Sequence, residues 1–304
     1  MKYEDFTVKE YGFAGHLAEP DEGADHAVIV IMGGEKSLLP GIKIAERFAE
    51  YGFLGLSVSL FGTDGLPQGV DRIPLDMFEP AITYLREKKK VASISTYGMS
   101  MGSVFAALIA QYLRGIDNVI MVSPTHVPFE GTLADKKHMT GKSMATWHGQ
   151  EIPYVKPDFS MGGMNKYIYV PEAGRKVMRM WKAYFDAYQN KELEKKAELQ
   201  LDKTGAKILM IAGTGDEAWP SDYSVQYLKN YLDKAGYEKQ YKAVIYPNVS
   251  HLTGMMPSKE KNKMLYRMIP FIGFMYKSFG KYRQECMEAF EKAEKEIIDF
   301  LKEK

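Results

Sequence analysis

One serine of this chain stands between two glycines, in the stretch Gly98-Met99-Ser100-Met101-Gly102. The run VASISTYG before it predicts a buried strand, and the run SVFAALIAQYLRG after it predicts a helix. A serine on a sharp strand-to-helix turn, with small residues two positions to either side, is typical of a nucleophile elbow. A plain glycine-flanked turn would share the five residues, but the flanking strand and helix favour the elbow. We therefore predict that Ser100 is a nucleophile.

A serine hydroxyl needs a general base, and that base needs a carboxylate to orient it. On a sheet of this type the three groups follow one another as Ser, then Asp or Glu, then His. Asp216 follows the apolar run ILMIAG, and His251 follows the run AVIY, so both are expected where buried strands end. Alone, Asp216 could cap the helix after Trp219, and His251 could be a loop histidine. Their order and placement predict a Ser100–His251–Asp216 triad.

A tetrahedral intermediate would need two backbone N–H donors for its oxyanion. Met101, directly after the nucleophile, is expected to supply one of them. The other should come from the loop after the strand HAVIVIM, where Gly33, Gly34 and Glu35 are all candidates. A simple glycine turn is the alternative role of this loop.

Five further residues are candidates for supporting roles. Glu217 competes with Asp216 as the acid, and Asp222 is a weaker competitor. His126, just past a predicted strand, is kept as a second candidate for contact with substrate. Trp219 and Gly33 are also expected to touch substrate.

The elements that must position these groups alternate along the chain. After an opening hairpin (6–20), the apolar patterns predict strands at 26–34, 53–62, 91–98 and 118–124, with helices at 38–52, 74–90 and 103–115 between them. The alternation resumes with a strand and its loop at 206–220, a helix at 224–236, a strand and its loop at 241–251 and a last helix at about 281–302. Strands and helices in alternation predict an α/β fold, with a mostly parallel sheet covered by helices on both faces.

Residues 125–204 interrupt this alternation. Pro, Gly, Met and aromatic residues come before a stretch, 173–200, that has helical spacing. We predict a single domain over 1–304 with a cap inserted at 125–204. A second segment, 255–280, mixes lysines with apolar residues, and its role stays open between core packing, an acyl-chain wall, a flap, a dimer contact and an interfacial patch.

Composition excludes several classes of function. The 304 residues carry a formal net charge of +1, so no overall field attracts nucleic acid. Cys286 is the one cysteine, which rules out an intramolecular disulfide and points to a reducing, cytoplasmic setting. No signal peptide and no apolar run of about 20 residues is seen. We expect no metal, no cofactor and no transmembrane segment, and a homo-oligomer stays open.

Three stretches resemble a known family. They are the long run from AERFAEYGF to AITYL (45–85), the acid loop AGTGDEAWPSDY (212–223) and the tripeptide HGQ (148–150). Together with the elbow they resemble the catalytic domain of the acyl-CoA thioesterase and bile acid-CoA:amino acid N-acyltransferase family. The amino-acid-transferring members typically use a cysteine nucleophile, where this chain has Ser100. The large N-terminal β-sandwich of the animal enzymes is expected to be missing, because Ser100 comes too early.

This resemblance implies the α/β-hydrolase fold and an acyl-CoA substrate. The residues and the resemblance together predict a serine hydrolase that cleaves an ester or thioester through an acyl-enzyme. Three alternatives stay open: a carboxylesterase acting on small esters, an acyl transfer to an amino acid, and a ligand-binding protein that keeps the fold without the chemistry.

Overall fold

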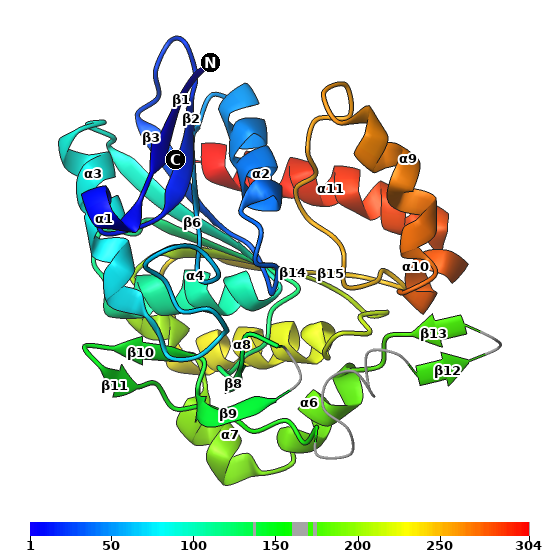
Figure 1. Cartoon of the computed structure of the whole chain (residues 1–304). Helices are drawn as coiled ribbons and strands as arrows, with labels where there is room; N and C mark the ends of the chain where they lie inside the picture. Colours follow the sequence, from blue (N-terminus) through cyan, green and yellow to red (C-terminus); the bar gives the residue numbers. More distant parts are fainter. Residues whose placement is uncertain (136–137, 160–169, 173–174, 304) are drawn as a thin grey trace.

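An eight-stranded sheet forms the centre of the computed structural model, which describes residues 1–135, 138–159, 170–172 and 175–303 (Figure 1). The strand order is β1-β2-β4-β3-β6-β7-β14-β15. The strands are β1 (Lys2–Phe6), β2 (Gly15–Glu19), β3 (His26–Ile31), β4 (Leu54–Val58), β6 (Ser93–Met99), β7 (Asn118–Val122), β14 (Lys207–Gly213) and β15 (Tyr241–Tyr246). Strand β2 is antiparallel to both neighbours, and the pairs from β4 to β15 are parallel.

Helices cover both faces of this sheet (Figure 1). One face carries α2 (Leu39–Glu50) and α11 (Arg283–Lys302), and the other carries α3 (Glu79–Glu87), α4 (Met101–Tyr112) and α8 (Ser221–Ala235). Within β3, Val28 and Val30 pack against the first helix layer, while Ile29 and Ile31 pack against the second. Alternate side chains therefore serve different layers, which is why the strand is apolar throughout. The predicted α/β class with a mostly parallel sheet is confirmed.

Two predicted elements differ in detail from the structure. The opening hairpin predicted at 6–20 is misplaced in its first half: β1 lies at Lys2–Phe6, and Val8–Tyr11 form a short helix, α1, with Thr7 accepting from Glu10 N at its start. The hairpin that forms pairs β1 with β2. The helix predicted from residue 74 begins only at Glu79, after β5 (Ile73–Pro74) and a 3₁₀ turn, η1 (Leu75–Phe78). Pro80 explains this start, because proline is tolerated in the first helical turn, where its missing N–H is not needed.

The segment between β7 and β14 contains the predicted cap. Its strands pair with one another or with β5, and within the described residues none of them joins the large sheet. The elements are β8 (Glu130–Thr132), β9 (Met139–Ser143), β10 (Ala145–Trp147), β11 (Gln150–Glu151), β12 (Val170–Glu172), β13 (Arg175–Val177), α6 (Trp181–Ala187), α7 (Lys191–Ala197) and η2 (Leu201–Lys203).

The helical stretch predicted at 173–200 is wrong at its start. Residues 173–174 lie outside the described residues, 175–177 form a strand, and helix begins at Trp181. The helical stretch is also divided, because the side chain of Asn190 accepts from Leu193 N and starts α7 as a separate helix.

The segment 255–280 folds into α9 (Lys263–Ile272) and the start of α10 (Lys277–Lys281). Across the described ranges, no helix has both the length and the apolarity that a bilayer crossing requires.

Candidate active site

Ser100 occupies a strained turn between β6 and α4. Its backbone has φ 59° and ψ −129°, in the region that side-chain-bearing residues rarely adopt. Ser100 N donates to Val122 O at 2.9 Å, and Ser100 O accepts from Ser103 N at 3.0 Å. These bonds hold the turn in place, and strain of this kind is found where a fold must present a reactive side chain.

Gly98 and Gly102 are required by packing around this turn. A Cβ on Gly98 would lie 2.1 Å from Gly102 O, and a Cβ on Gly102 would lie 2.1 Å from Ile31 O. Both distances are far inside van der Waals contact with backbone atoms, which cannot move away cheaply. The spacing noted in the sequence thus reflects the close approach of β6, α4 and β3.

The loops after three strands bring Ser100, His251 and Asp216 together. His251 Nε2 lies 2.9 Å from Ser100 Oγ, and His251 Nδ1 lies 2.9 Å from each oxygen of the Asp216 carboxylate. Because a carboxylate accepts only, Nδ1 carries the ring proton and Nε2 of the neutral ring is the acceptor for the serine hydroxyl. Asp216 and His251 are 9% and 4% exposed, so little water competes for these bonds.

Asp216 does not cap the helix after Trp219, which was its alternative interpretation, because α8 begins at Ser221 after Pro220 without a side-chain cap. Asp216 Oδ1 instead accepts from two amides of its own loop, Ala218 N at 2.9 Å and Trp219 N at 3.3 Å. Backbone donors and the histidine therefore fix the carboxylate in one orientation.

A buried shell behind His251 holds the ring and its loop. The Trp219 ring stands edge-on to the His251 ring at 5.1 Å, and the Tyr276 ring is stacked with it at 6.3 Å. Trp219 Nε1 donates to Ser123 O at 2.8 Å, and Ser123 Oγ donates to His251 O at 2.8 Å. Trp219 is 4% exposed. Trp219 thus packs against His251 and supports the histidine loop.

Sequence reasoning missed Ser123. This residue directly follows β7, has φ 46° and bonds to both the tryptophan and the histidine loop. A polar residue at the carboxyl end of a buried strand was the available signal, the same one that identified Asp216 and His251.

The competing acids do not contact His251. The carboxylate of Glu217 is buried and accepts from Ser278 N, and burial raises the pKa of Glu217 to about 7. Asp222 lies in the first turn of α8, where burial raises its pKa as well. Among the described residues, Asp216 is the carboxylate that binds the histidine.

His126 lies in the interior instead of on the surface of the site. It is fully buried, with Nδ1 3.0 Å from Ser224 Oγ and Nε2 3.0 Å from Glu194 Oε1. Burial lowers the pKa of His126, an effect that Glu194 partly opposes. Both ring nitrogens of His126 thus have side-chain partners, one from α7 and one from α8. We therefore do not propose His126 as a substrate contact.

The candidate oxyanion donors flank Ser100. Met101 is the first residue of α4, and a helix leaves its first N–H groups without an intrahelical acceptor. Gly33 lies directly against the nucleophile, since a Cβ on it would be 3.0 Å from Ser100 Cβ and 3.3 Å from Ser100 Oγ. Gly34 and Glu35 follow Gly33 in the same loop, and Gly34 is exposed while Glu35 is half-buried.

This arrangement has the parts needed for acyl transfer. A hydroxyl bonded to an imidazole, which is held by a carboxylate, can lose its proton as it attacks a carbonyl. Within the described ranges, no group of three or more His, Cys, Asp or Glu residues is placed to hold a metal ion.

Comparisons with known proteins point to one family. Residues 73–304 match the family model described as BAAT / Acyl-CoA thioester hydrolase C terminal. Human acyl-coenzyme A thioesterase 6 is 23% identical over 236 residues, covering 76% of this chain and 50% of that protein. Mouse acyl-coenzyme A thioesterase 1 is 22% identical over 234 residues, covering 76% and 49%. The chain thus spans about half the length of these curated relatives.

Solved structures of α/β hydrolases are also similar to this chain. Est1E from Butyrivibrio proteoclasticus has a TM-score of 0.44 and 20% identity, covering 82% of this chain and 89% of Est1E. The predicted fold is confirmed by the architecture itself, a mostly parallel sheet of eight strands with helices on both faces.

Proposed function

The chain belongs to the BAAT / acyl-CoA thioester hydrolase C-terminal family, and from this premise we propose that it is a serine hydrolase that cleaves an acyl thioester or ester. The observation that carries the proposal is the hydrogen-bonded chain from Ser100 through His251 to Asp216 at the carboxyl edge of the sheet. Acyl-CoA is the first substrate class to test, because the matching relatives are named acyl-coenzyme A thioesterases.

In the proposed acylation step, Ser100 Oγ attacks the carbonyl carbon while His251 Nε2 takes the hydroxyl proton. Asp216 stabilises the imidazolium that forms and holds the ring in position. The Met101 N–H and an amide of the Gly33–Glu35 loop bind the oxyanion. When the tetrahedral intermediate collapses, His251 returns its proton to the departing thiolate or alkoxide, and the acyl group stays on Ser100.

Deacylation repeats these steps with water as the nucleophile. His251 removes a proton from water as the water oxygen attacks the acyl-enzyme carbonyl. The second tetrahedral intermediate then releases the carboxylic acid, and the proton returns to Ser100 Oγ. An amine in place of water would give an amide, so access of water decides between hydrolysis and transfer.

We propose that residues 125–204 act as the cap over this site. Two backbone bonds support this role: Trp181 N donates to Glu217 O at 3.2 Å, and Met178 N donates to Met275 O at 2.9 Å. One bond reaches the acid loop beside Asp216, and the other reaches the segment that carries Tyr276 against His251. The inserted segment is therefore attached to both sides of the histidine.

Product analysis tests the proposed function. Wild type and Ser100→Ala would be given butyryl-CoA and p-nitrophenyl butyrate, each with and without glycine or taurine. Free acid from the thioester, lost in Ser100→Ala, supports a thioesterase. N-acyl products would instead identify a transferase, and turnover of the simple ester alone would identify a carboxylesterase.

A fluorophosphonate probe separates an enzyme from a binding protein. The probe reacts only with an activated serine, so the proposal requires one adduct on Ser100 in the wild type and none in Ser100→Ala. A wild type that stays unlabelled would favour a ligand-binding protein on a hydrolase fold.

A further inference from the structure

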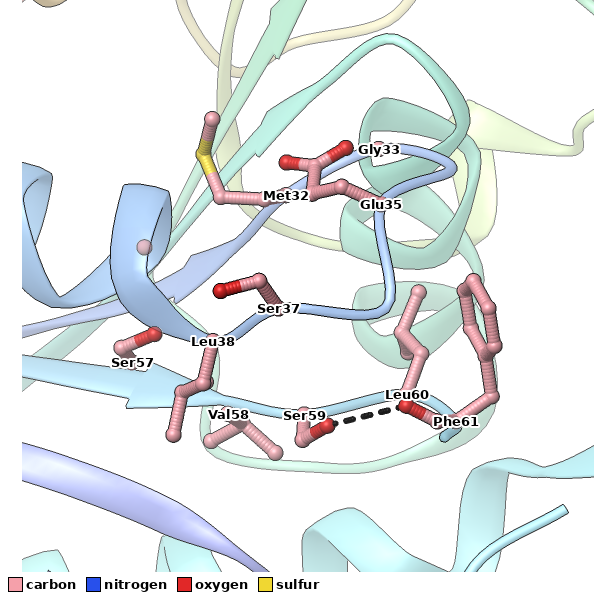
Figure 2. A pocket seen from close by; sticks show the side chains of 11 residues that line it. Met32, Gly33, Glu35, Ser37, Leu38, Ser57, Val58, Ser59, Leu60 and Phe61 are labelled. Atoms are coloured by element: carbon pink, nitrogen blue, oxygen red, sulfur yellow. Dashed lines mark hydrogen bonds between the residues drawn. The ribbon is translucent and has the colours of Figure 1, made fainter. Parts of the chain in front are cut away.

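A small cavity opens beside Gly33, between the loop that follows β3 and the loop that follows β4 (Figure 2). Its volume is about 20 Å³, which is room for a group the size of a hydroxyl, an ammonium or a water molecule. Four polar side chains line it, those of Glu35, Ser37, Ser57 and Ser59.

Two of these side chains are already occupied by local bonds. Ser37 Oγ accepts from Leu39 N at 3.2 Å, and Ser59 Oγ donates to Phe61 O at 3.3 Å. The other two, Glu35 and Ser57, are therefore the ones that can recognise a ligand.

Glu35 places its carboxylate next to the nucleophile. The point where Gly33 would carry a Cβ lies 3.3 Å from Glu35 Oε2 and 3.3 Å from Ser100 Oγ. The serine hydroxyl and the carboxylate therefore both border the space above Gly33. A substrate that enters this space with its carbonyl at Ser100 brings the atoms next to that carbonyl close to Glu35.

Among the residues that the structure describes, the Glu35 carboxylate forms no ion pair with a Lys, Arg or His. A negative charge this close to Ser100 opposes the oxyanion that develops during attack. A hydrogen-bond donor on the substrate would offset that repulsion as well as bind.

Ser57 supplies a second recognition group at the other end of the cavity (Figure 2). Its side chain is 1% exposed, and Ser57 Oγ has no hydrogen-bond partner among the described residues. A Cβ on Gly41 would lie 2.2 Å from Ser57 Oγ, so the glycine leaves room for this hydroxyl. A buried polar atom without a partner gains free energy when a ligand supplies one.

We propose that this cavity is a subsite for a hydrogen-bond-donating substituent of the acyl group, a hydroxyl or an ammonium close to the reacting carbonyl, which Glu35 binds and Ser57 helps to hold. This proposal rests on the proposed function, because it assigns the acyl group of the same reaction. A hydroxyl matches both residues, since it donates to the carboxylate and accepts from the serine. A carboxylate substituent is repelled, and a methyl group leaves both protein groups without a partner.

The test compares acyl groups of equal length on one leaving group. Wild type, Glu35→Gln and Ser57→Ala would be assayed with p-nitrophenyl esters of butyrate, 3-hydroxybutyrate, 3-aminobutyrate and succinate. The readout is kcat/KM for each ester divided by that for butyrate, which removes any general effect of the variant on catalysis. Glu87→Gln is the matched control. Glu87 is an exposed residue at the end of α3, and α3 leads into the start of β6, whereas Ser100 follows the end of β6.

The expected result is a reversal of preference in Glu35→Gln. The ratio for 3-hydroxybutyrate or for 3-aminobutyrate should fall about tenfold, and the ratio for succinate should rise about tenfold. Ser57→Ala should lower only the hydroxyl ratio, by about threefold. If the ratio falls for only one of these two esters, the result identifies whether the subsite binds a hydroxyl or an ammonium. Ratios in Glu35→Gln within twofold of wild type for all esters would overturn the proposal.

Binding measurements keep this test separate from the proposed function. Dissociation constants for the same esters would be measured by calorimetry on Ser100→Ala and on Ser100→Ala with Glu35→Gln. If the wild type turns over neither butyryl-CoA nor any of these esters, the proposed function fails, while tighter binding of the donor-bearing esters that depends on Glu35 would still support the subsite. Equal binding of all four esters would refute the subsite alone.

Discussion

Replacing Asp216 with Asn is the sharpest test of how the histidine is held. The Asn oxygen can keep the bonds that Ala218 N and Trp219 N make to Oδ1, so the turn should stay intact. The Asn nitrogen takes the place of Oδ2, 2.9 Å from His251 Nδ1, and can only donate to it, while the retained oxygen at the same distance already accepts from two backbone amides. We expect Nδ1 to become the acceptor, which moves the ring proton to Nε2 and leaves no base for Ser100.

The expected loss follows from this change of tautomer. A histidine held in the wrong tautomer lowers kcat by about 10⁴-fold. This loss corresponds to about 5.5 kcal/mol in activation free energy. Because the backbone bonds of residue 216 are kept, the free energy of unfolding should fall by only about 1 kcal/mol.

The assay is hydrolysis of p-nitrophenyl butyrate and butyryl-CoA, with thermal melting to confirm that the variant is folded. Asp222→Asn is the matched control, since this neighbouring carboxylate does not contact His251, and its kcat should stay within about threefold of wild type. A folded Asp216→Asn that retains a tenth of wild-type kcat would refute the proposed role. A larger loss in Glu217→Gln than in Asp216→Asn would assign the acid to Glu217 instead.

Three further predictions concern the elbow, the acid loop and the nucleophile. Gly98→Ala should destabilise the fold by about 3 kcal/mol or more, because its Cβ would meet Gly102 O at 2.1 Å, whereas Gly34→Ala, with open space at its Cβ, should change the free energy of unfolding by less than about 0.5 kcal/mol in urea melts. Burial raises the pKa of Glu217 from 4.5 to about 7, so its stabilising contribution is complete below about pH 4.5 and is lost as the pH rises to about 7. Glu217→Gln should therefore reduce the fall in unfolding free energy between pH 5 and pH 8 by about 2 kcal/mol, and an unchanged pH dependence would contradict this. Incubation of wild type with p-nitrophenyl butyrate, followed by an acid quench, should give a protein heavier by one butyryl group, while Ser100→Ala should gain no mass. A wild-type mass that is unchanged by the incubation would argue against an acyl-enzyme.

Local sequence patterns predicted the chain order of the site and the architecture around it. Strong apolar runs bounded by glycine mark β3, β6, β7 and β14, because a strand covered on both faces has no solvent-facing position. Ser100 and Asp216 could be selected for the same reason, since they closely follow such runs. His251 instead follows β15, an edge strand without a fully buried residue, so the prediction that a buried strand precedes it was wrong.

Element boundaries that depend on single turns were harder to predict. The helix predicted from residue 74 starts at Glu79, where Pro80 fits the first turn, and the stretch from 173 contains β13 before α6. Local preferences for helix or strand are weak in both segments, and tertiary contacts overrule them there.

Sequence alone determined which residue types follow the buried strands, because apolar periodicity and glycine spacing are properties of neighbours along the chain. The tertiary structure decided the rest: that His251 bonds Asp216 and not Glu217, that His126 is enclosed by α7 and α8, and that Glu35 and Ser100 both border the space above Gly33. Each of these depends on where side chains from distant strands and loops point once the sheet is assembled. Distances of a few ångströms between such groups are set by packing, which no pattern in a single stretch of sequence contains.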